Sequence, residues 1–360
     1  MDDALVPFRS PLRGFFGCRR GTRDELRPGD IGFVGMPSDA THSSRVGTRF
    51  GPRALRAATS ALMARLARDA EGEGLIDTRS GRLLELRDVA RMVDLGDAAI
   101  DEMDVEATIE AIAGMTCAIA GRGALPVAIG GDHFNGYPAC LGVSRALAAS
   151  RPGARLGYVQ VDGHLDYGDR LGAWGRYNHA TNARRVSELP NVALSNMVWI
   201  GIAGWVDGAD VAEIEEAGGL IFSAEDWHRL GSAEVARRAL DHALAGCDQL
   251  YLTVDIDALD AGFLPGTGSI VHSEITPRHY LDLLGALSAA PLCGVDLVEV
   301  SPPLDPSGRS EEIAARILLE AIRGHILVPA GDALGSPGPV RGGAGQLGRP
   351  ATGSGVRDAS

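Results

Sequence analysis

Two stretches of the sequence place acidic residues and a histidine at alternate positions directly after apolar runs. Residues 162–166 read DGHLD and follow the run 156–161, and residues 255–257 read DID and follow the run 250–254. Because residues i and i+2 of an extended chain point to the same side, each stretch aims its polar side chains in one direction. Carboxylates packed this closely would repel one another and lose hydration unless cations lay among them. Carboxylate oxygen with imidazole nitrogen is a ligand mixture for hard to borderline divalent metals.

A third segment strengthens this interpretation. Residues 130–133 read GGDH and follow another apolar run, 125–129. One such segment alone is more often a turn or a helix cap than a ligand set, and His133 alone would be an ordinary loop histidine as readily as a ligand. The three segments together favour a metal site.

The composition narrows the class of protein. The chain has 360 residues, 45% of them hydrophobic and 22% charged, and a formal net charge of −13. These values are typical of a globular protein, and the negative charge argues against binding to nucleic acid or to an anionic membrane surface. The five cysteines are scattered and never in CxxC spacing, which argues against a disulfide framework. With no long apolar run and no signal-peptide pattern at the start, we expect a cytoplasmic protein.

Short apolar runs alternate with helix-periodic stretches, which indicates a parallel sheet covered on both faces. We expect an α/β fold, a three-layer sandwich with a mostly parallel central sheet of about eight strands. The strands are expected at 30–35, 92–95, 125–129, 156–161, 197–203, 219–222, 249–255 and 293–299. The helices are expected at 51–67, 104–121, 136–149, 210–217, 233–246, 277–289 and 309–325.

The domain organisation is expected to be simple. Residues 1–27 would form an N-terminal extension, residues 28–329 one catalytic domain, and residues 330–360, rich in Gly, Pro and Ser, a disordered tail. In open α/β sheets ligands bind beyond the carboxyl ends of the strands. The three acidic segments lie at such ends, and so does a further acid, Glu299.

Several motifs occur in a characteristic order between about residues 14 and 326. They are GTRFGP (47–52), GGDH (130–133), DGHLD (162–166), His179, DIDALD (255–260), PGTG (265–268) and DLVEVSP (296–302). This ordered set resembles the ureohydrolase family of arginases, agmatinases and guanidino-acid hydrolases. The resemblance implies an arginase-like fold and a centre of two Mn²⁺ ions per chain, with Ni²⁺ as an alternative.

The family pattern implies a ligand set at matching positions. One ion would be held by His133, Asp162, Asp166 and Asp255, and the other by Asp162, His164, Asp255 and Asp257. Asp162 and Asp255 would bridge the two ions, Asp132 would lie beside the ligands, and Asp260 would be a structural turn residue.

The resemblance also implies a reaction. A hydroxide bridging the two metals would attack the carbon of a guanidinium, whose N–H groups Glu299 would bind. Asp166 would pass a proton toward the leaving amine, and His179 would shuttle protons or stabilise the tetrahedral intermediate. Without the resemblance, Glu299 would be read as a buried acid paired with an arginine and His179 as a loop histidine. The other histidines are interpreted as surface or structural, although His42 and His272 lie near segments expected to form the pocket.

The sequence departs from the family pattern at positions that contact substrate. Gly168 and Gly175 stand where arginases carry Asn and Ser side chains that grip the amino-acid head group, so we do not expect arginine as substrate. Phe134 replaces a usual Ser, Gly163 replaces a usual Ala, and residues 269–274 (SIVHSE) replace the usual pocket loop.

The substrate class remains open among several hypotheses. We expect a small cationic guanidino compound, such as agmatine, a guanidino acid or a larger guanidinylated metabolite, that is cleaved to urea and an amine. Arg170 or Arg176 would pair with a carboxylate on the substrate tail. The alternatives are a formimidoyl hydrolase that releases formamide and a catalytically silent binding relative. A homotrimer or homohexamer is expected.

Overall fold

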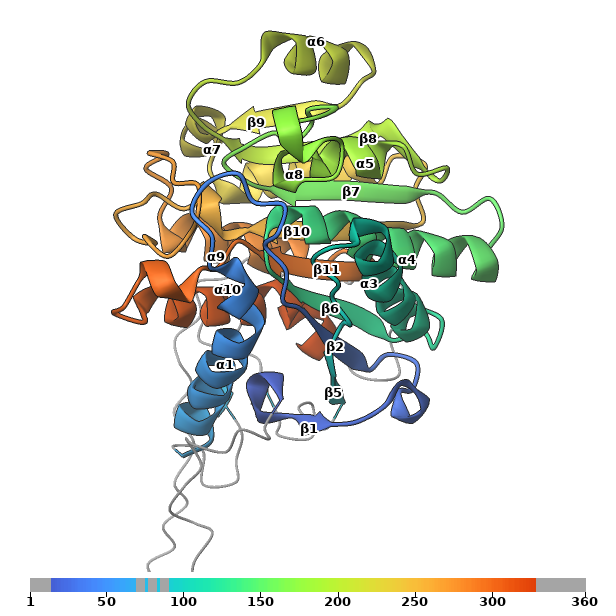
Figure 1. The fold of residues 1–360 in the computed structure, drawn as a ribbon, viewed down its shortest axis with the longest axis vertical. Coiled ribbons are helices and arrows are strands. Elements are labelled where there is room, and N and C mark those ends of the chain that lie inside the picture. The colour runs from blue at the N-terminus through green and yellow to red at the C-terminus, as the bar shows by residue number, and fades with distance from the viewer. Residues whose placement is uncertain (1–13, 69–74, 77–82, 85–90, 328–360) are drawn as a thin grey trace, which may run out of the picture.

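The structure, a computed structural model, describes residues 14–68, 75–76, 83–84 and 91–327. Nine parallel strands form one sheet in the order β1-β5-β2-β6-β11-β10-β7-β8-β9, which Figure 1 shows stacked from β9 at the top to β1 at the bottom. The strands are β1 (Arg19–Arg20), β2 (Ile31–Met36), β5 (Met92–Asp97), β6 (Leu125–Gly130), β7 (Leu156–Val161), β8 (Val192–Ile202), β9 (Leu220–Ser223), β10 (Gln249–Asp255) and β11 (Leu292–Val298). The expected parallel three-layer architecture is confirmed.

Eight of these strands match the expected ones, and β1 was not predicted. It comes from the segment expected to be an extension, and it pairs with β5 at the edge of the sheet. Two consecutive arginines show no hydrophobic pattern that would predict a strand. The strand is recognised only by its hydrogen-bonded pairing with β5. The same segment buries Phe15 and Phe16 in the core. A short antiparallel hairpin of β3 (Leu75–Ile76) and β4 (Leu83–Leu84) was also not predicted. The expected disordered tail lies outside the described residues.

Two hydrophobic clusters hold helices against opposite faces of the sheet. One cluster includes residues of α1, α7, α8, α9 and α10, and the other includes residues of α3, α4, α5 and α6. Their bounds are α1 Gly51–Arg68, α3 Val105–Ala120, α4 Gly136–Ser150, α5 Asn182–Ser187, α6 Gly208–Glu216, α7 Ala224–Leu230, α8 Ser232–Ala243, α9 Pro277–Leu287 and α10 Arg309–Leu327. The short helices α5 and α7 were missed because two turns or fewer show no clear periodicity. Among the described helices, none combines the length and the apolar character needed to span a membrane.

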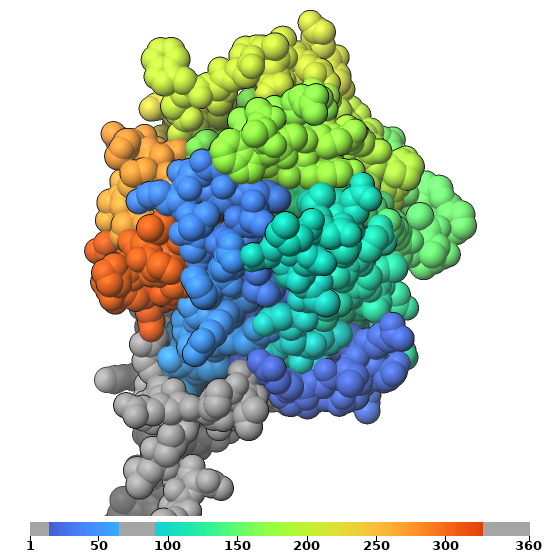
Figure 2. Space-filling model, in the orientation of Figure 1, coloured from blue at the N-terminus to red at the C-terminus, as the bar shows by residue number. Residues whose placement is uncertain are grey.

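Segments that are far apart in the sequence meet on one face. In Figure 2 the blue N-terminal segment runs between the orange C-terminal atoms and the teal atoms of residues near 100–120. The guanidinium of Arg45 donates to the carbonyl oxygens of Thr267 and Gly268, at 2.9 and 3.1 Å. The loop after β2 is thereby joined to the loop after β10.

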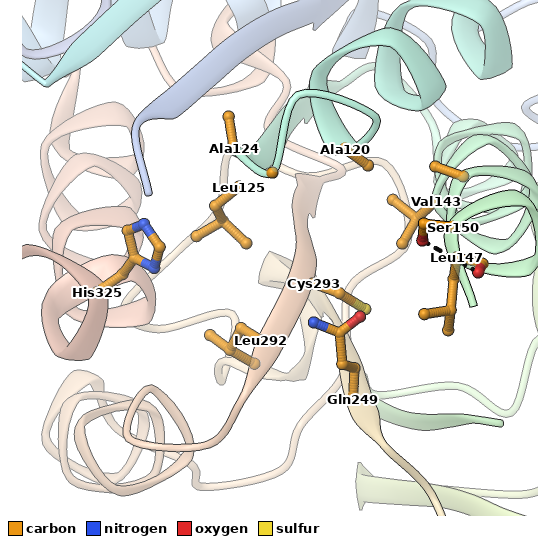
Figure 3. A pocket seen from close by; sticks show the side chains of 12 residues that line it. Ala120, Ala124, Leu125, Val143, Leu147, Ser150, Gln249, Leu292, Cys293 and His325 are labelled. Carbon is orange, nitrogen blue, oxygen red and sulfur yellow. Dashed lines mark hydrogen bonds between the residues drawn. The ribbon is translucent and has the colours of Figure 1, made fainter. Parts of the chain in front are cut away.

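A pocket opens at the amino ends of the strands. Figure 3 shows it lined by Leu125 of β6, Gln249 of β10, and Leu292 and Cys293 of β11, with His325 of α10 at its side. Three of these residues begin their strands. The pocket therefore lies at the edge of the sheet opposite to the acidic segments and is separate from their chemistry.

A buried ion pair joins α1 to strand β5 of the sheet. Arg56 donates through Nε and Nη2 to the two carboxylate oxygens of Asp94, at 2.7 and 3.1 Å, and both residues are buried. Its guanidinium also lies 4.5 Å from the ring centroid of Phe15. Arg56 thus neutralises a fully buried acid and packs on the N-terminal segment.

We expect Arg56→Ala to lower the free energy of unfolding by about 3–5 kcal/mol, because Asp94 would remain buried without its positively charged partner. Urea denaturation followed by circular dichroism measures the change. Arg53→Ala is the matched control, since Arg53 lies on the exposed side of the same helix and should change stability by less than about 0.5 kcal/mol. Equal effects of the two substitutions would contradict this account of the ion pair.

Candidate metal centre

Four neighbouring strands deliver the candidate ligands to one place. The sheet order β6-β11-β10-β7 sets the carboxyl ends of these strands side by side. His133 follows β6, Glu299 follows β11, Asp257 follows β10, and the segment 162–166 follows β7. Parallel strands end at the same edge, so residues from four distant parts of the sequence converge.

The first group of ligand atoms surrounds one imidazole nitrogen. Nδ1 of His133 lies 2.9 Å from a carboxylate oxygen of Asp162, 2.9 Å from one of Asp166 and 3.1 Å from one of Asp255. All four residues are buried, with at most 9% of their surface exposed. The structure therefore brings together the four residues that the family pattern assigned to one ion.

The other nitrogen of His133, Nε2, carries a proton. Nε2 is 3.0 Å from Oγ1 of Thr253, whose hydroxyl donates to Asp296 at 2.6 Å. Since the single hydroxyl proton of Thr253 goes to Asp296, Oγ1 accepts from Nε2–H, and Nδ1 is the nitrogen that faces the three carboxylates. Burial lowers the pKa of His133, but these carboxylates raise it more, to well above its ordinary value, so Nδ1 carries a proton when no metal is bound. Nδ1 makes no hydrogen bond although it is fully buried. A divalent cation bound by Nδ1 and the carboxylate oxygens would take the place of that proton, so these residues fit a divalent metal.

A second group shares one acid with the first. Asp162, His164 and Asp257 place ligand atoms within 4.8 Å of one another, and Nδ1 of His164 lies 3.0 Å from Asp257. The His164 side chain is 41% exposed, which makes it the open side of this group. Asp255, expected to bridge both ions, lies in the first group and accepts the backbone N–H of Asp257 at 2.8 Å.

The electrostatics of both groups reflect crowded negative charge. Burial and the charge of Asp162 raise the pKa of Asp166 to about 7. Burial and the neighbouring acids also raise the pKa of Asp255, with Asp257 contributing most among them. The pKa of Asp162 is lowered, because its hydrogen bonds and charge interactions with His133 and His164 outweigh its burial. Divalent cations would relieve this repulsion.

Two acids at the site have a left-handed backbone conformation, with positive φ, that residues other than glycine rarely adopt. The φ angles are +46° at Asp166 and +66° at Glu299. The backbone of each is held in place, since Asp166 O accepts the N–H of Ala183 and the N–H of Glu299 donates to Gly131 O, both at 2.9 Å. Strain of this kind persists only where surrounding contacts impose it and is typical of functional sites.

Without the family resemblance, Glu299 was predicted to pair with an arginine. The structure shows no such pair among the described residues. One carboxylate oxygen accepts the backbone N–H of His133 at 2.8 Å, and the other lies 3.1 Å from Nε2 of His42. The ring of His42 stacks on the ring of His179, with centroids 4.5 Å apart and planes 4° apart. Glu299 and His179 are therefore neighbours, as expected, and His42 joins them.

His42 is the residue of this cluster that sequence reasoning missed. It was interpreted as surface or structural, yet its side chain is fully buried. Its place five residues before the motif 47–52 was the available signal. No spacing rule connects that segment to position 299.

The two arginines expected at the substrate tail lie outside this cluster. Arg176 is ion-paired with Glu188 at 2.7 Å and lies 5.4 Å from the ring centroid of Tyr177. Arg170 is exposed and has no hydrogen bond or ion pair with the described residues. Of these two arginines, Arg170 is the one that makes no such contact with the described residues.

Phe134 was expected as an apolar group beside the site. It is buried and packs against Tyr137 and Tyr177, with ring centroids 6.1 and 5.8 Å away. Its main contacts therefore secure the loop after β7 to α4.

Two departures from the family pattern, Gly163 and the loop 269–274, are in contact in the structure. A Cβ at Gly163 would lie 2.8 Å from a methyl group of Val271, which belongs to the altered loop 269–274. The same Cβ would lie 3.2 Å from Oδ1 of Asp257, the oxygen that accepts the N–H of Gly163. Glycine at 163 lets the altered loop approach the second group of ligands.

We expect Gly163→Ala to lower the free energy of unfolding by about 1–3 kcal/mol through overpacking. Val271→Ala should restore most of that loss in the double variant, with a coupling of at least about 1 kcal/mol in a double-mutant cycle. Gly168→Ala is the control, because its Cβ would meet only Ala180 O, at 3.5 Å. Strictly additive effects of Gly163→Ala and Val271→Ala would show that the two positions are independent.

The chain matches the model of the arginase family over residues 29–323. A guanidinopropionase of Pseudomonas aeruginosa is 31% identical over 81% of this chain and 85% of that protein. A formimidoylglutamase of Halobacterium salinarum is 31% identical over 82% of this chain and 88% of that protein. The solved structure of a proclavaminate amidino hydrolase from Streptomyces clavuligerus is 26% identical, with a TM-score of 0.74, over 89% of this chain and 99% of that one. The chain therefore belongs to the arginase family and is a hydrolase of the C–N bonds of guanidino or amidine compounds.

Proposed function

We propose that the protein is an amidinohydrolase dependent on two divalent metal ions, Mn²⁺ in preference, that cleaves a guanidino compound other than arginine to urea and an amine. The observation that carries this proposal is the position of His133 Nδ1, within 3.1 Å of oxygens of three buried carboxylates. A second group that shares Asp162 supports a count of two ions.

The two groups divide the ligands as follows. His133, Asp162, Asp166 and Asp255 would hold one ion, and Asp162, His164 and Asp257 would hold the other, with Asp255 adjacent to both. Two divalent cations bound there would lower the pKa of a water molecule and so supply hydroxide near neutral pH. Carboxylate-rich sites with imidazole suit Mn²⁺, and the same ligand set accepts Ni²⁺.

The chain's own groups would bind the substrate and transfer protons. The carboxylate of Glu299 would bind the N–H groups of the cationic substrate and orient its central carbon. Burial lowers the pKa of His179 to about 4, so its imidazole is neutral at pH 7 and can accept a proton. Asp166 would accept a proton from the nucleophile and pass it toward the leaving amine.

The residues of the loop after β7 indicate which chemical groups the substrate tail carries. Gly168 and Gly175 offer no side chain to an α-amino or α-carboxylate group, which argues against arginine. Arg170 is the exposed cation on the same loop and suits a terminal carboxylate, as in the substrate named for the guanidinopropionase relative. A guanidino acid is therefore the preferred substrate class.

Formimidoyl hydrolysis is the second candidate, because a relative of equal identity carries that name. An amidinium carbon presents the same planar cation to Glu299 and the same carbon to a nucleophile. The products separate the two reactions, since a guanidino substrate gives urea and a formimidoyl substrate gives formamide.

We expect Mn²⁺-loaded protein to release urea from 3-guanidinopropionate or 4-guanidinobutyrate with a kcat/KM at least about 100-fold above that for arginine. Agmatine, free guanidine and formimidoylglutamate complete the panel, with urea, formamide and amine measured in each reaction. Arg170→Ala should raise KM for the guanidino acids about tenfold and leave agmatine unchanged. Arginine as the best substrate would refute the head-group argument, and formamide as the main product would favour the second candidate.

We expect acid to stabilise the metal-free protein. Asp166 and Asp132, each with a folded-state pKa of about 7, bind protons between pH 4 and 7 that the unfolded chain has lost. The free energy of unfolding therefore falls as the pH rises through this window. Scanning calorimetry of chelated protein should give a Tm several degrees higher at pH 6 than at pH 8.

Added Mn²⁺ should raise Tm more at pH 8 than at pH 6, because protons compete with the metal for the same carboxylates. Mg²⁺ at equal concentration is the control for ionic strength. A metal effect that is larger at pH 6 would contradict the assignment of these acids as ligands.

A further inference from the structure

His42 lies in the loop between β2 and α1 and reaches into the candidate site. Its side chain is fully buried, and its Nε2 lies 3.1 Å from Oε2 of Glu299. Thr41, the preceding residue, donates through its hydroxyl and backbone N–H to Asp132, at 2.7 and 3.2 Å. A residue beside the candidate ligands therefore holds the loop that presents His42.

The tautomer of His42 follows from its two contacts. The backbone N–H of Ser44 donates to Nδ1 at 3.0 Å, so this nitrogen carries a lone pair. The proton must then lie on Nε2, which donates it to Glu299. Burial lowers the pKa of His42 and the Glu299 carboxylate raises it more, but a proton on Nδ1 would break the bond from Ser44.

The two hydrogen bonds to Glu299 leave one edge of its carboxylate available to bind a substrate cation. Oε1 accepts one neutral donor, the N–H of His133, and Oε2 accepts another, Nε2–H of His42. Neither donor cancels the charge of the carboxylate. Each oxygen keeps a lone pair, which suits two parallel N–H groups on one edge of a planar cation.

A glycine and a second imidazole lie directly beside the ring of His42. A Cβ at Gly268 would lie 2.4 Å from Nε2 of His42, so the loop 265–268 passes directly against the ring. The ring also stacks on His179. The imidazole thus contacts both a glycine of the loop 265–268 and the residue expected to transfer protons.

We propose that His42 is a positioning residue that, as a neutral Nε2–H donor, holds Glu299 with one open lone pair on each oxygen and so selects planar amidinium or guanidinium groups over ammonium groups. This inference rests on the proposed function, because it assigns the cation-binding role to Glu299. It adds His42, in a defined tautomer, as the residue that orients Glu299 for binding the substrate cation.

Two substitutions separate the donor from the ring. His42→Gln keeps an N–H donor near the position of Nε2, whereas His42→Phe keeps a flat ring against His179 and donates nothing. With Mn²⁺ content unchanged, we expect the Phe variant to raise KM for the best guanidino substrate at least about tenfold, the loss typical of a hydrogen bond to a charged group. The Gln variant should stay within about threefold of the parent protein. A Phe variant with parental KM, or a Gln variant as poor as the Phe variant, would overturn the proposal.

The tautomer is tested independently of turnover. Neutron diffraction from crystals of the metal-loaded full chain at pH 7.5 should show deuterium on Nε2 of His42 and none on Nδ1. Deuterium on Nδ1, alone or on both nitrogens, would overturn the proposal even if both variants failed to fold. Absence of urea or formamide release from every substrate would instead refute the proposed function, while the diffraction result would still decide the role of His42.

Discussion

Buried negative charge at the carboxyl edge of the sheet is the constraint on which the other features of the site depend. Four acids of the two ligand groups and Glu299 each expose no more than 9% of their surface. In a medium of low dielectric their repulsion is strong and their lost hydration is costly. Two divalent cations would formally balance the four ligand carboxylates. Glu299, held by neutral donors, would keep one negative charge for one substrate cation. The charge distribution thus separates the metal groups from the substrate group.

His133 connects these two groups physically. Its Nδ1 belongs to the first ligand group, its Nε2 is fixed by Thr253, and its backbone N–H binds Glu299. A shift of this one residue would change the metal geometry and the orientation of the cation-binding acid together. Asp166 and Glu299 have positive φ angles, so the contacts of the site hold their backbone in a strained conformation.

Sequence reasoning recovered the parts of the molecule that repeat a pattern. The eight apolar runs became eight strands because parallel strands buried on both faces are nearly continuous in hydrophobic residues. The acids at 162–166 and 255–257 converged because parallel strands end together. The expected i and i+2 alternation does not apply there, since residues 256–258 form a 3-10 helix and Asp166 lies in a loop with a positive φ angle. The roles of these residues, the domain boundaries and the expected homotrimer or homohexamer stay predictions.

What the sequence could not supply depends on contacts between loops. β1 exists through pairing with β5, and the ion pair of Arg176 with Glu188 could not be read from spacing. His42 reaches Glu299 across 257 positions, and no local rule encodes such a contact. Gly163 and the loop at Val271 looked like separate departures, whereas their contact makes them one change.

The count of metal ions per chain tests the central claim most directly. Protein freed of metal by chelation, then loaded with Mn²⁺ and washed, should retain about two ions per chain by inductively coupled plasma mass spectrometry. Asp162→Asn, which alters the acid shared by both ligand groups, should retain fewer than about one, while Asp169→Asn on the exposed neighbouring loop should retain two. Parental protein that retains no Mn²⁺ or Ni²⁺, or an Asp162→Asn variant that retains two ions, would contradict the account.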